Sequence, residues 1–161
     1  MKKFNKLSKI LFSLFVISAV FVTSFPMVSA SAKTNITVKR SKVMESYIGD
    51  KNNFTAFVTT DGVIVYCMDI DKKGAVSGTG YTFSKEADAG LLWIIKNSYP
   101  NKTITGIAER DQYITQSAVW WYIDDVYGYN KLNTAFKTTD KEAYLGMRNE
   151  IIKLVNGGKA H

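Results

Sequence analysis

The sequence holds a single cysteine, Cys67, and a single histidine, His161, among its 161 residues. One cysteine cannot form a disulfide within the chain, and one cysteine with one histidine is too few ligands for a zinc site, so we expect neither a metal nor a cofactor. A thiol protease or acyltransferase needs a base, nearly always histidine, to hold its thiolate. His161 is the last residue and follows Gly157-Gly158, so we expect it on a flexible tail that cannot serve Cys67.

Acidic residues are also missing before Lys33, whereas four lysines make the start of the chain basic (Lys2, Lys3, Lys6, Lys9). An apolar run, 10–25, follows, and then Pro26 and a set of small residues that ends at Ala32. This order is typical of a secretory signal peptide, so we expect residues 1–32 to be one, cleaved after Ala30 or Ala32. The run is shorter than the roughly 20 apolar residues that span a bilayer, which argues against an uncleaved anchor.

The charge excess is small once the signal peptide is set aside. The chain has 21 basic and 14 acidic residues, and removing the four signal lysines leaves 17 basic residues and a net charge of +3. No block of Lys and Arg occurs after residue 40. We therefore exclude nucleic acid as a partner. Residues 33–161 are enough for one hydrophobic core, so we expect a single exported domain.

The first half of this domain has the pattern of strands. A short run, Ile36–Val38, predicts one strand, and 54–59 and 63–70 are rich in β-branched and aromatic residues. Asp61-Gly62 lies between the last two and predicts a hairpin, because glycine tolerates the positive φ of a tight turn. Cys67 is then near the end of a hairpin strand, before a glycine-rich loop over 71–81.

The second half has the pattern of helices. We expect one from Ser84, its cap, to about Asn97, and a second over 108–123 whose one face carries Tyr113, Gln116, Ser117 and Trp120. Thr139 and Glu142 predict a capping box for a third helix, with Asn156-Gly157-Gly158 at its end. The predicted apolar positions of this helix are Tyr144, Met147, Ile151 and Val155. Strands followed by helices predict an α+β fold.

Two residues have uncertain roles on this pattern. Cys67 stands among Val63, Val65 and Tyr66, and a thiol in such surroundings is often a small buried hydrophobe. Gln116 shares a helix face with aromatic residues, where a carboxamide without hydrogen-bond partners costs about 1–3 kcal/mol. The residues alone leave both the structural and the functional interpretation open.

Two motifs resemble the thioester domain of Gram-positive surface adhesins. The first is Tyr66-Cys67-Met68-Asp69, and the second is Thr115-Gln116-Ser117-Ala118-Val119-Trp120. The family has an aromatic-Cys pair on a strand and Thr-Gln-x-Ala-Val/Ile-Trp on a helix, and the resemblance extends from about Val38 to Asn156.

The resemblance implies an internal thioester between Cys67 and Gln116, inside a β-sandwich-like or barrel-like sheet with a helical section. It implies covalent attachment to a host surface protein through a lysine amine, once per molecule, so we do not expect an enzyme. Thr115 and Trp120 belong to the surrounding motif, and Tyr66 and Trp120 are placed to cover the bond. Asp69 either orients a proton-bearing group or ends the strand.

The resemblance also implies a location. The family's domains usually continue with closing strands after the third helix, so we expect a domain that lacks them. We expect it at the cell surface or wall as part of a longer adhesin, or secreted if the chain ends at His161. The rival hypothesis is a non-covalent binding module with an inert Cys67, whose contacts are aromatic (Trp121, Tyr122, Tyr127, Tyr129).

Overall fold

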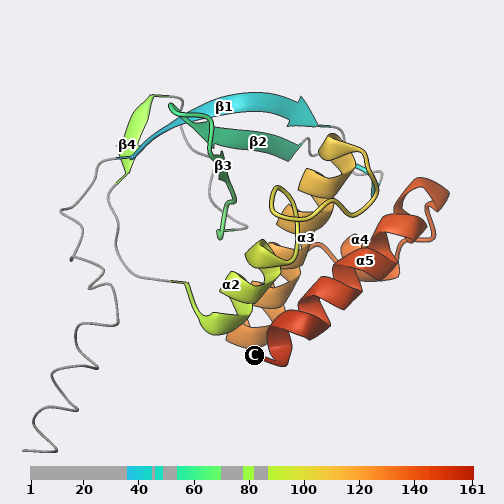
Figure 1. Ribbon diagram of the computed structural model, residues 1–161. Helices are drawn as coiled ribbons and strands as arrows, with labels where there is room; N and C mark the ends of the chain where they lie inside the picture. The colour runs from blue at the N-terminus through green and yellow to red at the C-terminus, as the bar shows by residue number, and fades with distance from the viewer. Residues whose placement is uncertain (1–35, 45, 49–53, 70–77, 82–86) are drawn as a thin grey trace, which may run out of the picture. The chain divides into compact units, whose positions relative to one another are not determined.

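The computed structural model describes residues 36–44, 46–48, 54–69, 78–81 and 87–161 (Figure 1). The expected signal peptide, 1–32, lies outside the described residues, and so does most of the predicted loop over 71–81. The signal peptide and residues 71–77 of the loop therefore stay predictions, whereas the end of the predicted loop is wrong, because residues 79–81 pair with the first strand and form a strand themselves.

The described strands form one antiparallel sheet with the order β3-β2-β1-β4. Their bounds are Ile36–Met44 for β1, Phe54–Thr59 for β2, Ile64–Val65 for β3 and Thr79–Tyr81 for β4. β1 is longer than the predicted run, and its register with β2 shifts between Arg40 and Lys42. β1 lies between β2 and β4 and thereby joins the hairpin to the segment that follows residue 77.

The hairpin predicted at Asp61-Gly62 is confirmed. Gly62 has a φ of 88°, its N–H donates to the Thr59 carbonyl at 3.0 Å, and the Thr59 N–H donates to the Val63 carbonyl at 2.8 Å. The second strand is shorter than predicted, because only Ile64–Val65 pairs with β2. Cys67 therefore lies beyond the strand, in a segment, 66–69, that has no regular secondary structure and has left the sheet.

The first two helices begin and end differently from their predictions. α2 (Ala89–Lys96) is capped by the Asp88 side chain, which accepts from the Leu91 N–H at 2.7 Å. Ser84, the predicted cap, lies outside the described residues. α3 (Ala108–Tyr127) starts where predicted and continues one turn further, to Gly128, whose φ of 65° is the left-handed conformation that ends many helices.

The predicted capping box of the third helix is wrong. α5 (Glu142–Lys159) has Lys141 at its N-cap position and no side-chain cap there. Thr139 instead follows the short helix α4 (Ala135–Thr138), whose end it marks. A one-turn helix so close in sequence leaves Thr139 two residues before the N-cap position of α5, too early to cap it.

The predicted end of α5 at Asn156-Gly157-Gly158 is also wrong. The helix continues to Lys159, and the two glycines serve its packing against α2. A Cβ atom on Gly157 would lie 2.1 Å from a ring carbon of Trp93, and one on Gly158 would lie 2.9 Å from the end of Ile94. Glycine here permits close approach of two helices and does not stop one.

His161 is not on a loose tail. Its ring stacks on the Trp93 ring with centroids 5.3 Å apart, and its Nδ1 lies 2.8 Å from the Gly157 carbonyl. The C-terminus is thus held on α2 and α5, because α5 continues almost to the last residue.

The core is built mainly by the helices, and α2, α3 and α5 lie side by side in Figure 1. Met44, Ile48 and Ala56 extend this core to the strand section. The predicted apolar positions of α5 are all buried (Tyr144, Met147, Ile151, Val155), so that face is confirmed. The α+β class is confirmed, and in the described residues its β part is a single sheet. None of the described helices is long and apolar enough to cross a membrane.

Candidate functional site

Gln116 lies in the middle of α3 on the buried face that its spacing predicts. Its side chain is 2% exposed, as is that of Tyr113, one turn earlier. A carboxamide buried this deeply needs partners for both its oxygen and its nitrogen. The sequence pattern identified the need but not the partners.

Both partners are backbone atoms of Cys67. The Cys67 N–H donates to Gln116 Oε1 at 2.7 Å, and Gln116 Nε2 donates to the Cys67 carbonyl at 2.7 Å. The side-chain amide thus binds Cys67 as a neighbouring strand would bind it. This explains why the segment leaves the sheet after Val65: its hydrogen bonds go to α3 instead of to β2. The predicted pair of residues is brought together, 49 positions apart in sequence.

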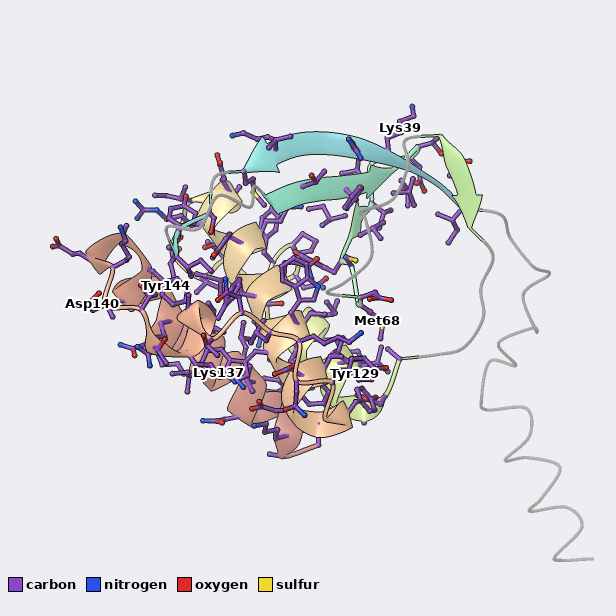
Figure 2. The ribbon with its side chains drawn as sticks, turned by 180° about the vertical axis from the view of Figure 1, so that it is seen from behind. Lys39, Met68, Tyr129, Lys137, Asp140 and Tyr144 are labelled. Carbon is purple, nitrogen blue, oxygen red and sulfur yellow. The ribbon has the colours of Figure 1, made fainter. Side chains whose placement is uncertain are left out.

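The thiol of Cys67 contacts its own segment, two residues further along the chain. Sγ donates to the backbone carbonyl of Asp69 at 3.2 Å. Asp69 accepts this bond through its backbone carbonyl. Of the two roles that the sequence left open for Asp69, ending the strand is wrong, because β3 already ends at Val65. The other, orienting a proton-bearing group, stays a prediction. Cys67 is half-buried and Met68 beside it is exposed, just past β3 (Figure 2). Cys67 thus lies between the buried Gln116 amide, which its backbone binds, and the exposed Met68.

A second set of hydrogen bonds holds the residues that precede Cys67 and Gln116. The Tyr66 hydroxyl donates to the Tyr99 carbonyl at 2.6 Å, and the Tyr99 N–H donates to Thr115 Oγ1 at 3.2 Å. Thr115 Oγ1 in turn donates to the Asp111 carbonyl at 2.8 Å. Sequence reasoning missed Tyr99, and no local signal could have shown it, because Tyr99 contributes its backbone.

The carboxylate of Asp111 organises the loop that leads into α3. It accepts from the N–H groups of Ile104 and Thr105 at 2.9 and 2.8 Å, and from the Thr105 hydroxyl at 2.6 Å. Burial by itself raises the pKa of Asp111, but these hydrogen bonds outweigh it and hold the pKa below its usual value. The carboxylate therefore stays charged, and its oxygens accept hydrogen bonds from the loop.

Comparison with known proteins agrees with this geometry. The family model described as the thioester domain matches residues 64–157, more than half of the chain, and this range contains both Cys67 and Gln116. The chain belongs to the thioester-domain family. Among curated proteins, none matches the chain.

A solved structure shares the fold of this thioester domain. The structure of the Bacillus anthracis TIE protein superposes with a TM-score of 0.51 and 21% sequence identity, over 81% of this chain and 24% of that one. At this identity the likeness shows the fold alone. The chain spans about a quarter of the length of the TIE protein structure.

Trp120 of the thioester domain lies one turn after Gln116 and is partly buried. One contact of its ring is with Phe136 of α4, edge to face, at a centroid distance of 6.5 Å. The ring thus joins α3 to α4. That Trp120 and Tyr66 cover the bond stays a prediction.

The four aromatic residues of the rival hypothesis do not form one open surface. Tyr122 is buried, with its hydroxyl 3.2 Å from Asp88, and the Trp121 ring is covered by the Lys137 ammonium at 5.5 Å. Only Tyr127 and Tyr129 of the four are exposed as a pair, with ring centroids 6.0 Å apart. Tyr122 therefore belongs to the core, and Trp121 contributes to the contact of α3 with α4.

Within the described ranges, no group of three or more His, Cys, Asp and Glu side chains is placed to hold a metal ion.

Proposed function

We propose that Cys67 and Gln116 form an internal thioester, with which the exported domain acylates an amine on another molecule. The observation that carries this proposal is the two-point hydrogen bonding of the Gln116 amide to the Cys67 backbone. Two residues far apart in sequence are already held in contact, and proximity of this kind is worth roughly 7–11 kcal/mol in reactions between bound groups. Membership of the thioester-domain family supports the same pairing.

Bond formation exchanges one acyl bond for another. The Cys67 sulfur attacks Gln116 Cδ, the Cδ–Nε2 bond breaks, and ammonia leaves with the thiol proton. Negative charge develops on Oε1 during this step, and the Cys67 N–H at 2.7 Å is oriented to stabilise it. Removing one such donor costs roughly 10²–10³ in rate in enzymes with an oxyanion hole.

Amine capture reverses this exchange with a different nitrogen. A neutral amine attacks Cδ, the Cδ–Sγ bond breaks, and the thiol takes up the proton that the amine loses. The product is a substituted amide at Gln116, so each molecule reacts once and nothing turns over. Burial of Gln116, which is 2% exposed, favours survival of the acyl group until an amine arrives, because bulk water has little access to it.

The partner that we propose is a lysine amine on a host surface protein. Three observations support it: the signal-peptide pattern of residues 1–32, the thioester-domain family, and the half-buried position of Cys67 beside the exposed Met68. We place the domain outside the cell, at the surface as part of a longer adhesin.

Intact-mass measurement of the mature domain tests the bond. We expect a mass lower than that of the sequence by one ammonia, restored to the full value in Cys67→Ala and in Gln116→Ala. Incubation with methylamine should then add one methylamine to Gln116 and release a thiol that reacts with a maleimide.

The rival hypothesis of an inert thiol makes the opposite prediction. It requires the full mass in the wild-type protein, no methylamine adduct, and a Cys67 thiol that labels only after denaturation. That result would overturn the thioester, and the exposed pair Tyr127 and Tyr129 would become the first candidates for a non-covalent contact.

A further inference from the structure

The segment that carries Cys67 is held at two successive residues. Cys67 is bound through its backbone to Gln116, and Tyr66 through its hydroxyl to the Tyr99 carbonyl at 2.6 Å. Outside the sheet, this segment has no ladder of strand hydrogen bonds to hold it. Side-chain contacts must therefore determine where the Cys67 sulfur lies.

The residue before Gln116 is tied to the same place. Thr115 is fully buried, and its Oγ1 accepts from the Tyr99 N–H at 3.2 Å while donating to the Asp111 carbonyl at 2.8 Å. The backbone of Tyr99 thus binds the residue before Cys67 through its carbonyl and the residue before Gln116 through its N–H.

We propose that Tyr66 and Thr115, joined through the backbone of Tyr99, are positioning residues that set the approach of the Cys67 sulfur to Gln116 Cδ. The inference rests on the proposed thioester. Neither hydroxyl touches the reacting atoms, and neither is exchanged in the reaction. Their contribution is to hold both reacting residues against the backbone of one residue, Tyr99, and a misplacement of about 1 Å in such a site can cost about a hundredfold in rate.

Tyr66 is suited to positioning and not to proton transfer. Burial is the main cause that raises the pKa of Tyr66 far above its ordinary value, so the hydroxyl stays protonated at any physiological pH. It therefore remains a hydrogen-bond donor to the Tyr99 carbonyl throughout the reaction.

The experiment measures closure of the bond, not only its presence. Opening with ammonium restores the Gln116 amide and the Cys67 thiol, because ammonia attacks Cδ, the Cδ–Sγ bond breaks and the sulfur takes up a proton. After the ammonium is removed, re-closure is followed by intact mass as loss of one ammonia. The closed fraction in freshly purified protein is a second measurement.

We expect Tyr66→Phe and Thr115→Val to slow re-closure by about ten- to a hundredfold. Thr115→Ser keeps the hydroxyl and should stay within about threefold of wild type. Because the two residues share one partner, the backbone of Tyr99, the double variant Tyr66→Phe/Thr115→Val should be less impaired than the product of the single effects.

The matched control is Tyr144→Phe. Tyr144 is also buried and also donates its hydroxyl to a backbone carbonyl, that of Phe136 at 2.7 Å, but this bond joins α5 to α4. Tyr144 lies among these helices in Figure 2. We expect both Tyr144→Phe and Tyr66→Phe to lower the thermal unfolding midpoint, because each removes a buried hydrogen bond. Only Tyr144→Phe should leave the re-closure rate and the closed fraction unchanged.

The mass and re-closure measurements distinguish failure of the proposed thioester from failure of the positioning role. If the wild-type protein shows the full mass, the proposed thioester fails and the positioning role falls with it. If the wild-type protein loses ammonia, while Tyr66→Phe and Thr115→Val match Tyr144→Phe in closed fraction and in any re-closure, only the positioning role is overturned.

Discussion

At the scale of single residues, the amide of Gln116 fits the Cys67 backbone because it offers one acceptor and one donor on neighbouring atoms. Oε1 receives the Cys67 N–H and Nε2 reaches the Cys67 carbonyl, both at 2.7 Å. A glutamate has the same shape but, when ionised, only acceptors. Glutamine is thus suited to this position by its hydrogen bonds, and the proposed thioester would add the need for an amide nitrogen that can leave.

The hydrogen-bonding requirement can be measured apart from the chemistry in a Cys67→Ala background, where no thioester forms. We expect Gln116→Glu in that background to lower the free energy of unfolding by about 2–4 kcal/mol at pH 7, because a buried carboxylate then faces the carbonyl of residue 67. A protonated carboxyl can donate, so the loss should shrink as the pH falls towards about 4.

Chemical denaturation at the two pH values checks this prediction, with Gln112→Glu, one turn earlier on α3 and half-buried, as the control. Equal losses for the two substitutions at pH 7 would show that the Gln116 amide is not specially bound.

At the scale of elements, α5 packs against α2 through residues that look like a helix end. Gly157 lies under the Trp93 ring, where a Cβ would meet three ring carbons within 2.9 Å. Gly146, on the same helix, has nothing within 4 Å of its would-be Cβ. The two glycines thus share a secondary structure and differ in packing.

We expect Gly157→Ala to destabilise the domain by about 2 kcal/mol, because overpacking typically costs 1–3 kcal/mol and outweighs the better helix propensity of alanine. Gly146→Ala should stabilise it by about 0.5–1 kcal/mol, since only propensity changes there. Urea unfolding of both variants measures the difference, and a Gly157→Ala domain as stable as Gly146→Ala would contradict the close α2–α5 contact.

At the scale of the whole described domain, ion pairs join the ends of three helices. Asp125 of α3 pairs with Lys137 of α4 at 2.7 Å and with Lys159 of α5 at 2.6 Å, and Lys137 also lies 3.5 Å from Asp124. Burial by itself raises the pKa of Asp125, but the two lysines outweigh it and hold the pKa below its usual value. These pairs therefore stabilise the helical section only while Asp125 is charged.

The sign of the pH dependence follows from that lowered pKa. A carboxyl whose pKa is lower in the folded than in the unfolded state stabilises the fold above the unfolded pKa of about 4, and this contribution is lost as the pH falls through the folded value. We expect Asp125→Asn to cost about 0.5–1 kcal/mol at pH 7, a modest loss because the pairs are partly exposed.

Thermal unfolding across pH checks this, with the wild-type and Asp125→Asn unfolding midpoints converging as the pH falls below about 4. The difference between the two unfolding midpoints at pH 7 should also decrease in about 1 M salt, where exposed ion pairs are screened. A difference that stayed constant with pH and salt would assign the effect to packing instead of charge.

Local sequence determined the elements whose cause is local. The turn at Gly62 follows from glycine's freedom at positive φ, and the buried face of α5 follows from apolar spacing at 3.6 residues per turn. The pairing of Cys67 with Gln116 was reached through a motif resemblance. Spacing alone showed only that Gln116 would be buried and in need of partners.

Tertiary structure decided what depends on contacts between distant segments. β3 ends early because the Cys67 backbone binds Gln116, and α5 continues through Gly157 because Trp93 packs over it. Tyr99 enters the site only through its backbone N–H and carbonyl, which every residue but proline possesses and which no side-chain pattern marks. The sequence by itself therefore determined, through its two motifs, that Cys67 and Gln116 are the candidate pair, while the fold alone decided what holds them in place.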